Sequence, residues 1–503
     1  LGESDVNDTR IFGGRFAARW SPNDLWTLDA VAGSQDVEAD DGQYVAAELG
    51  GLTKAANRRE AYDDRFRFGS VTASGPLAGG DVTSATAATF RRTETAFDAS
   101  AAFPFLFEDP AEATPIGAPG TFDSAVSRHG LIHESRFTSS NSANIKWLLG
   151  VFAAARWTDT DTLLRFDRSP ETDLVEINRR RDRSIESAVF ADGDWAFSRR
   201  WTATLGARVS LVAFRTDVDL VRTAPPDDLM LQRASTDVSF APRMGVTYRL
   251  SEGAAVYAQA TRGFRNGGFN VNSPPQAVLA NPDDNLDVGA LDRFASDRLW
   301  SGELGFKFAS ASGRAVLNAA AFLVSWQDIQ ADVVPATGIA TIVNAGDARI
   351  WGIEAETRAK VQSWLDLSAA VTWTDTTLLN ANPFVSDAPA GLPVAPDLTA
   401  YIRAEVNAPV ADWTARAAVD YRYIGESELT FDSADRTQGG VSDVSADIWV
   451  ERGGVSFGVF IDNALNTRDD TFAFGNPFSF ASEPQATPLR PRTIGLSATI
   501  DFG

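Results

Sequence analysis

The sequence predicts an all-β fold, specifically a transmembrane antiparallel β-barrel. The first reason is a period of two in hydropathy. Residues 493–502, TIGLSATIDF, alternate apolar and polar side chains without a break, as a strand with two different faces requires. Residues 12–20 and 146–157 repeat this alternation. A soluble sandwich alternates in the same way, so the spacing of the strands has to decide between the two folds.

The spacing favours the barrel. The connections fall into two classes that alternate without exception, one short, such as 21–24 and 251–253, and one long, such as 159–182 and 216–235. Tight turns at one end and long loops at the other are typical of outer-membrane barrels. The pattern predicts 19 strands, near 9–20, 25–37, 63–75, 81–95, 130–140, 145–158, 183–197, 200–215, 236–249, 254–264, 296–309, 313–327, 346–361, 363–375, 398–408, 412–426, 440–451, 454–464 and 492–502.

The tryptophans supply a third observation. Indole rings prefer the membrane–water interface, because they are flat and apolar and donate one hydrogen bond. We therefore predict two aromatic belts rather than a soluble core in which tryptophan caps strands, an alternative that leaves the loop asymmetry unexplained. Of the 13 tryptophans, eight lie next to short turns and form the predicted membrane-interface belt: Trp20, Trp26, Trp147, Trp195, Trp201, Trp364, Trp413 and Trp449. Towards the long loops lie Trp157, Trp300, Trp326, Trp351 and Trp373.

Composition excludes several classes of function. With 45 basic and 67 acidic residues the net charge is -22, which argues against nucleic acid as a partner and against a polybasic membrane anchor. The absence of cysteine rules out disulfides, thiolate metal sites and a cysteine nucleophile. The mean hydropathy of -0.14 is compatible with a barrel, because its two faces cancel. The apolar stretch 147–155 is too short for a membrane-spanning helix, which needs about 20 residues.

Six segments resemble, in the expected order, the barrel of TonB-dependent outer-membrane receptors. Together they extend over nearly the whole chain: DVNDTRIFGGRFAARWSPND (5–24), AAVYAQATRGFRNGGFN (254–270), SGELGFKFASASGRAVLNAAAFLVSWQDIQ (301–330), NAGDARIWGIEAE (344–356), VFIDNALNTRDDTF (459–472) and PRTIGLSATIDFG (491–503). Ala464, Asn466 and Asp469 depart from the family's Asn-Leu-Phe-Asp-x-x-Tyr region.

The resemblance implies that residues 1–503 are the β-barrel domain of such a receptor. The family's barrel has about 22 strands, so the predicted strands are interpreted as its C-terminal set, with about three first strands absent. The family also carries an N-terminal plug domain with a short TonB-contacting segment. We expect both to be absent here.

The implied function is active import across the outer membrane of a Gram-negative bacterium. The cargo would be a scarce bulky solute such as siderophore-iron, a vitamin or an oligosaccharide, and the TonB complex of the inner membrane would deliver the energy through the plug. Other implied partners are outer-membrane lipid, lipopolysaccharide and the barrel-assembly machinery. No cofactor and no enzyme activity are expected. The alternatives are a passive outer-membrane porin, which usually has about 16–18 strands, and a truncated, non-functional receptor remnant.

Candidate substrate-lining residues lie around one motif, GFRNGGF. Arg265, Asn266 and Asn270 begin a long outer loop, and Gln259 and Thr261 are predicted to face the lumen. The alternatives for these side chains are ordinary loop polarity or contact with a plug. The glycines resemble a phosphate-binding loop only weakly, because the segment follows a strand but opens no helix.

Charged runs and the two histidines complete the candidates. The run RRRDR (179–183) is predicted at the outer rim, where it either faces lipopolysaccharide phosphate or draws in an anionic substrate. The acidic runs 36–41, 107–112, 281–287 and 467–470 are interpreted as solvated loops or as sites where divalent cations bridge lipopolysaccharide phosphates. If they contact the substrate instead, they favour a neutral or cationic ligand over an anionic one. His129 and His133 share a strand face about 13 Å apart, so no metal site is expected. No catalytic motif stands out.

Overall fold

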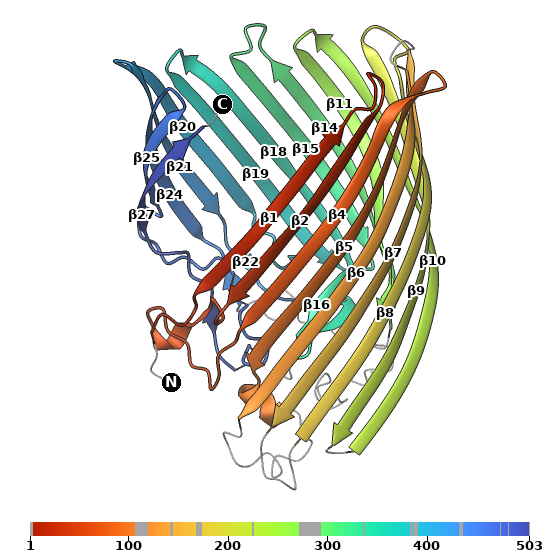
Figure 1. Cartoon of the computed structure of the whole chain (residues 1–503), viewed down its shortest axis with the longest axis vertical. Helices are drawn as coiled ribbons and strands as arrows, with labels where there is room; N and C mark the ends of the chain where they lie inside the picture. The colour runs from red at the N-terminus through yellow and green to blue at the C-terminus, as the bar shows by residue number, and fades with distance from the viewer. Residues whose placement is uncertain are drawn as a thin grey trace.

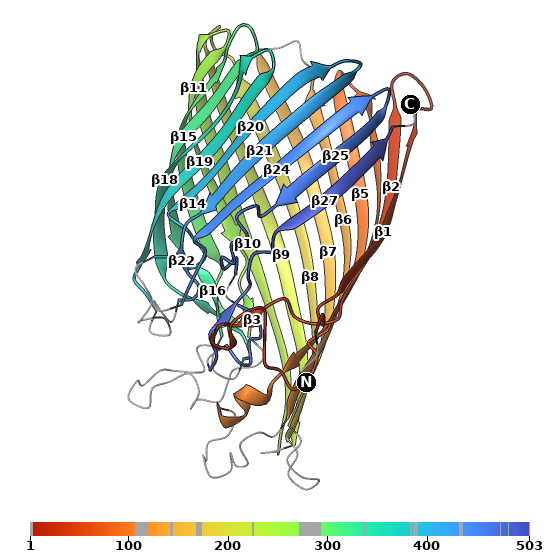
Figure 2. The same ribbon diagram turned by 90° about the vertical axis from the view of Figure 1, so that its left-hand side faces the viewer.

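Nineteen antiparallel strands form one curled sheet in the computed structural model (Figures 1 and 2). Neighbours in the chain are neighbours in the sheet, from the β1–β2 pair to the β25–β27 pair. The structure describes residues 4–105, 119–140, 144–166, 174–223, 226–270, 293–334, 338–382, 385, 391–431, 436–472, 474–480 and 482–501. The predicted all-β antiparallel barrel and its 19 strands are confirmed.

The first part of the sheet contains the longest strands. In chain order the nine strands of this part are β1 (Thr9–Trp20), β2 (Thr27–Ala39), β4 (Tyr62–Leu77), β5 (Gly80–Asp98), β6 (Gly120–Ser139), β7 (Ile145–Phe166), β8 (Leu174–Trp195), β9 (Trp201–Thr223) and β10 (Pro226–Ser251).

The second part contains shorter strands. They are β11 (Ala254–Arg265), β14 (Asp297–Ala309), β15 (Ala315–Gln327), β18 (Asp347–Gln362), β19 (Leu365–Leu379), β20 (Leu398–Val410), β21 (Trp413–Ile424), β24 (Val441–Arg452), β25 (Val455–Asp462) and β27 (Thr493–Ile500).

The short turns and the long connections lie at opposite ends of the sheet, as predicted (Figure 1). Three predicted loops are wrong in extent, and one of them is the loop before β6, which begins at Gly120 rather than near 130. Most of 159–182 and 216–235 continues the strands β7, β8, β9 and β10. These segments carry polar side chains on both faces, so hydropathy alone ends the strand too early, whereas cross-strand pairing needs only the backbone. Residues 141–143 of one predicted turn lie outside the described residues.

The sheet has two free edges in the part of the chain that the structure describes. Within it, β1 pairs only with β2, and β27 pairs only with β25. Every residue of β1 is exposed. Large apolar side chains lie at both edges, with Phe12 79% and Leu496 83% exposed. An unpaired, apolar strand edge is a template for further strand pairing.

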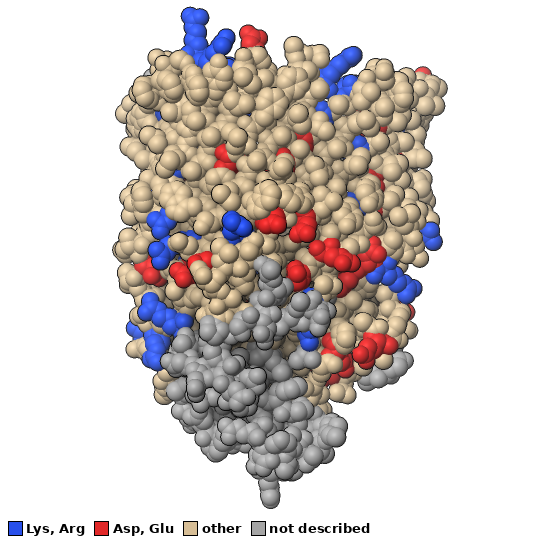
Figure 3. Space-filling view, turned by 180° about the vertical axis from the view of Figure 1, so that it is seen from behind, with Lys and Arg blue, Asp and Glu red and all other residues tan. Residues whose placement is uncertain are grey.

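The two faces of the sheet differ in chemistry. On one face of β7 and its neighbours, apolar side chains such as Leu149, Val151 and Val209 are exposed. The opposite face carries cross-strand ion pairs such as Arg208–Glu186 at 2.7 Å and Arg403–Asp420 at 2.6 Å. An apolar outer wall around a polar lumen is the arrangement of a membrane barrel. Figure 3 shows few charged side chains over much of the outer wall and more of them towards the long-loop end.

Small elements fold over the long-loop end. They are the paired strands β12 (Gly268–Phe269) and β13 (Arg293–Phe294), β16 (Gln330–Val333) and β17 (Thr341–Asn344), β22 (Ser427–Glu428) and β23 (Thr437–Gln438), and β3 (Val45–Ala46) and β26 (Gln485–Ala486), with the 3-10 helices η1 (Ala47–Leu49) and η2 (Ser100–Phe105). No helix in the described residues has the length and the apolar run needed to cross a membrane.

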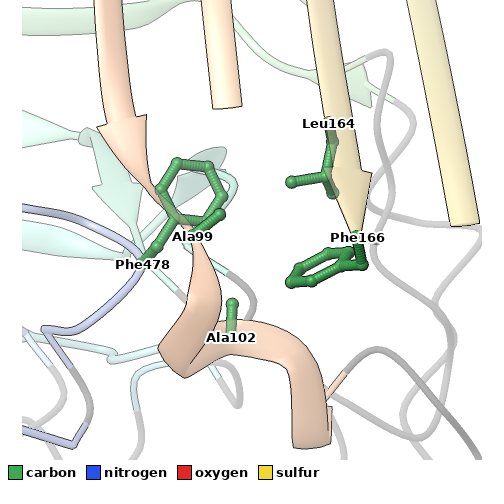
Figure 4. Close-up of a cluster of buried hydrophobic side chains, with 5 residues drawn as sticks. All are labelled: Ala99, Ala102, Leu164, Phe166 and Phe478. Carbon is green, nitrogen blue, oxygen red and sulfur yellow. The ribbon is translucent and has the colours of Figure 1, made fainter. Parts of the chain in front are cut away.

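An apolar cluster lies beneath these elements. Phe478 from the last loop packs with Ala99 and Ala102 beside β5 and with Leu164 and Phe166 at the end of β7 (Figure 4). All five side chains are at most 2% exposed. The cluster therefore joins the last long loop to the wall formed by the long strands.

Candidate functional site

Arg265 ends β11 at the long-loop end, where it holds two hairpins in place. Its Nε donates to Asp297 Oδ2 at 2.7 Å, its backbone N–H donates to Asp297 Oδ1 at 3.0 Å, and its Nη2 donates to the carbonyl of Gln330 at 2.9 Å. The guanidinium also lies 5.1 Å from the ring centroid of Trp326. The carboxylate of Asp297 is almost wholly buried, so Arg265 neutralises a charge that water does not reach.

The other predicted loop residues also join segments to one another. The carbonyl of Asn266 accepts a hydrogen bond from Gln330 Nε2 at 2.9 Å. Asn270 forms two bonds with Ile342, donating from Nδ2 to its carbonyl and accepting its N–H at Oδ1, at 2.6 and 3.0 Å. Asn344 continues the chain of contacts, because its Oδ1 accepts the N–H of Ala295 at 2.7 Å. The hairpins β12–β13 and β16–β17 are therefore bound together over the mouth.

Gln259 and Thr261 lie lower on β11, on the lumen-facing side. Gln259 pairs in register with Glu303 of β14 and Gly245 of β10, and Thr261 pairs with Ser301 and Arg243. Directly opposite residues of an antiparallel pair share a face. These two positions therefore belong to one polar wall.

A second cluster at the same end has a buried charge network. Lys54 Nζ lies 2.5 Å from Asp41 Oδ1 and 3.0 Å from Glu60 Oε2. The side chains of Lys54 and Glu60 are 10% and 1% exposed. The ammonium also lies 4.7 Å from the ring centroid of Tyr44. One lysine thus compensates two buried carboxylates.

Asn476 ties this network to the last long loop. Its Nδ2 donates to Glu60 Oε1 at 2.6 Å and to the carbonyl of Asp98 at 2.7 Å. Gln485 then accepts the backbone N–H of Asn476 at 2.7 Å. A cavity of about 590 Å³ adjoins the network, and its lining includes Asp41, Lys54, Arg58, Asp98, Asn476 and Glu483.

Burial perturbs two titratable groups beside the cavity. It raises the pKa of Tyr44, and the nearby charge of Glu60 raises it further. Burial also raises the pKa of Glu483, with the charges of Asp98 and Glu48 as smaller causes. A carboxyl group whose anionic form is disfavoured at a cavity wall is a common feature of binding sites.

Sequence reasoning missed this second cluster. Asn476 and Glu60 are 416 residues apart in the chain, so no local pattern connects them. The one available signal was Lys54, because lysine occurs only four times in the sequence and a rare residue beside acidic runs can mark a charge network. Of the predicted acidic runs, 107–112 and 281–287 lie outside the described residues.

Four tryptophans near the short turns lie on the outer face. Ring contacts link Phe137 to Trp147 at 5.5 Å, and Trp201 to Tyr248 at 4.6 Å. The exposed side chains are Trp20, Trp147, Trp195 and Trp201. Trp364 is also exposed in its turn, and Trp26 and Trp413 are partly exposed.

Trp449 instead lies on the inner wall. It pairs in register with Arg416, whose guanidinium is 5.8 Å from the Trp449 ring. Towards the long loops, Trp157, Trp300, Trp351 and Trp373 are exposed, whereas Trp326 packs beneath Arg265.

Both histidines lie on the outer face of β6. The His129 ring is 4.9 Å from the Phe90 ring. His133 shares hydrogen bonds with the hydroxyls of Thr86 and Ser135 at 2.9 and 3.0 Å. Each imidazole therefore has ordinary aromatic or hydroxyl neighbours.

A comparison with protein-family models matches residues 2–463 to the family described as TonB dependent receptor-like, beta-barrel. The match extends over most of the chain.

Solved structures share the fold. The ferric yersiniabactin uptake receptor FyuA of Yersinia pestis superimposes with a TM-score of 0.78 at 17% identity, over 98% of this chain and 71% of that one. The ferric-catecholate import receptor Fiu of E. coli K12 gives 0.72 at 14%, over 99% and 75%. The copper transporter OprC gives 0.71 at 15%, over 98% and 72%. At such identities the likeness concerns the fold alone.

Proposed function

Because this chain belongs to the TonB-dependent receptor β-barrel family, we propose that it imports a scarce bulky solute across a Gram-negative outer membrane with energy from the TonB complex. Members of the family are outer-membrane transport receptors rather than enzymes. The proposed partners are TonB, through a plug, and the lipids of the outer membrane.

One observation carries the proposal, namely the difference between the two faces of the wall. Exposed apolar side chains such as Val151 and Val189 suit lipid, whereas the opposite face holds ion pairs such as Arg403–Asp420 at 2.6 Å. The apolar face is suited to contact with a bilayer, and the polar face is suited to contact with water or with a polar domain inside the barrel.

Of the three possible cargoes, we propose an iron chelate in preference to a vitamin or an oligosaccharide. Support comes from solved structures of similar fold, which include receptors or transporters for ferric yersiniabactin, ferric catecholate and ferric citrate. The cavity at the long-loop end is lined by both basic and acidic side chains, so it offers polar contacts of both signs to a bulky chelate.

The capture region is proposed to consist of both loop clusters. Gln259 and Thr261 would line the polar path below the mouth. Arg265, Asn266 and Asn270 would act mainly by holding the two hairpins over it, because their polar groups bind neighbouring segments.

The free edges support a further part of the proposal. The strands β1 and β27, each of which pairs on one side only among the described residues, would be joined by about three additional strands, giving the family's closed barrel. An N-terminal plug would fill the lumen. Reading the gene upstream of the codon for Leu1 tests this directly, since a plug-like region and further strands are expected there.

Uptake of iron tests the transport function. The full-length gene would be expressed in a Gram-negative host that lacks its own ferric receptors, and radiolabelled iron uptake measured with a panel of chelates. We expect uptake of at least one chelate that disappears when TonB is deleted.

The two alternatives give different results. Uptake that persists without TonB and rises linearly with concentration would identify a passive porin. No uptake of any chelate, vitamin or oligosaccharide by a correctly inserted full-length protein would identify a remnant.

A further inference from the structure

A hydrogen-bonded polar cluster lies on the outer face of β5 and β6. The imidazole of His133 shares hydrogen bonds with the hydroxyls of Thr86 at 2.9 Å and Ser135 at 3.0 Å, and Ser135 shares one with Ser84 at 2.9 Å. The register places Ser135 opposite Val151, so these four polar side chains, here called the His133 cluster, belong to the apolar outer wall.

The cluster lies midway between two aromatic levels of this wall. On the long-loop side, β5 to β7 carry an aromatic row of Phe90, His129 and Trp157. On the short-turn side, Phe137 contacts Trp147. His133 is four residues from both His129 and Phe137, or about 13 Å along the strand in each direction. Because the apolar band of such a barrel is about 25 Å tall, we expect the cluster near the bilayer midplane.

Small side chains surround the cluster. Ala73 lies opposite Ser84 on β4, and Ala153 lies opposite His133 on β7. A shallow groove of about 510 Å³ adjoins Ser135, and most of its lining is apolar. These neighbours leave the polar atoms accessible to whatever lies against the wall.

The cluster does not use all of its own hydrogen-bond donors. Three hydroxyls and one imidazole with a single N–H supply four donors, but only three hydrogen bonds join them. These side chains form no other hydrogen bond in the part of the chain that the structure describes. At least one donor is therefore left over, which is costly in hydrocarbon because acyl chains offer no acceptor.

A second copy of the same surface suits these groups. Hydroxyls and an imidazole can each donate and accept hydrogen bonds, so the cluster complements itself, as a patch of one charge would not. A two-fold contact brings the same patch of both subunits together. If the two-fold axis lies along the membrane normal, both clusters are at the same depth.

We propose that the outer wall of β4 to β7 is the contact surface of a homodimer within the membrane, with the two His133 clusters meeting at the two-fold axis. The donor left over in each cluster bonds an acceptor in the other, and the small neighbours let the two walls approach. Side-chain hydrogen bonds between membrane segments are individually weak, so the dimer should dissociate in excess detergent. The inference rests on the proposed outer-membrane location but not on import.

Cysteine cross-linking tests the dimer, because these 503 residues contain no cysteine. Ala153→Cys places one thiol beside the cluster. Val419→Cys, on the outer face of β21 in the other wall, is the matched control. The full-length protein, without other cysteines, is treated in outer membranes with a short thiol cross-linker. We expect about tenfold more cross-linked dimer from Ala153→Cys than from Val419→Cys.

Variants of the cluster separate hydrogen bonding from mere proximity. His133→Leu/Ser135→Ala, added to Ala153→Cys, should reduce cross-linking to the level of Val419→Cys. The barrel should still fold, because apolar side chains suit a lipid-facing wall. His133→Gln, which keeps donors and an acceptor, should retain most of the cross-linking.

Three results would each overturn the proposal. They are equal cross-linking of Ala153→Cys and Val419→Cys, unchanged cross-linking after the apolar substitutions, and a product whose mass is not twice that of the protein. Because none of these readouts involves uptake, a failure of transport would leave the result intact.

Discussion

The wall formed by β6 to β10 and the wall formed by β20 to β27 pair their backbone groups at the long-loop end in different ways. The first has strands of 20 to 26 residues, which continue beyond the aromatic row as paired, charged ladders. The second has strands of 8 to 13 residues, and folded hairpins take over beyond them. Both walls satisfy their backbone, one by extending the sheet and one by side-chain bonds between loops.

The difference indicates separate tasks for the two sides. A paired ladder is rigid and presents a regular row of charges to the outside, which suits contact with lipid headgroups. Hairpins held by a few side chains open at lower cost, which suits a surface that must admit and release a ligand. The following substitutions test that division, beginning with the charge network that binds the last long loop to the loop between β2 and β4.

Lys54→Met should have the largest effect. It leaves the buried carboxylates of Asp41 and Glu60 without their cation, and breaking a buried ion pair costs about 3–5 kcal/mol. Hydrogen exchange of residues 40–60 and 474–486 should become much faster. Lys146→Met, at an exposed position near a short turn, serves as control, and a loss below about 1 kcal/mol would show that the network does not fasten the loops.

Val151→Arg should have the second-largest effect on stability. Val151 lies between Trp147 and Trp157 on the outer face of β7, and a charge at the bilayer midplane costs about 2–4 kcal/mol. This cost is measured as the change in the free energy of unfolding in lipid vesicles. Thr158→Arg, on the inner face of the same strand, should cost far less. Equal costs for the two substitutions would mean that the faces have been assigned wrongly.

Asp297→Asn tests the hairpins β12–β13 and β16–β17, which lie between the two walls in chain order. The substitution keeps the shape but removes the charge that accepts from Arg265 and from the N–H of Gln330. Hydrogen bonds to charged groups contribute about 1.5–3 kcal/mol. Proteolysis within 266–270 and 330–344 should accelerate.

The exposed Asp328–Arg298 pair, 3.9 Å apart, offers a matched control for that substitution. Asp328→Asn should change stability by less than about 1 kcal/mol. Equal losses of stability from Asp297→Asn and Asp328→Asn would mean that the buried Asp297 carboxylate has no special role.

Trp147→Ala and Trp201→Ala should each weaken membrane seating by about 1 kcal/mol, because each loses an aromatic partner on the outer face. Ligand binding should hardly change. Trp449→Ala removes a ring from the inner wall and should leave membrane seating unaltered. Membrane seating is measured as the partition of each variant between vesicles of different lipid composition. Loss of uptake from a fully stable Trp147→Ala barrel would refute the belt as placed.

The sequence predicted the strands, their number and the faces of β7, because a period of two is local information. It ended β7 too early and began β8 too late, since polar residues on both faces hide a strand that continues into water. It selected Arg265 and Asn270 as substrate-lining candidates by position, but their bonds to Asp297 and Ile342 depend on segments 32 and 72 residues away. No single-sequence pattern encodes such pairings.

Glu483→Gln should have the smallest effect on stability, and the size of that effect should depend on pH. The pKa of Glu483 is raised in the folded loop, mainly by burial. A carboxyl group with a raised folded pKa contributes stability that is present below its unfolded pKa and is lost as the pH rises through the folded value. At pH 7 the wild-type loop should therefore exchange faster than that of Glu483→Gln, and at pH 4 the two should converge. A wild-type loop that gained protection relative to the variant between pH 4 and 7 would reverse the sign and place an unrecognised cation beside Glu483.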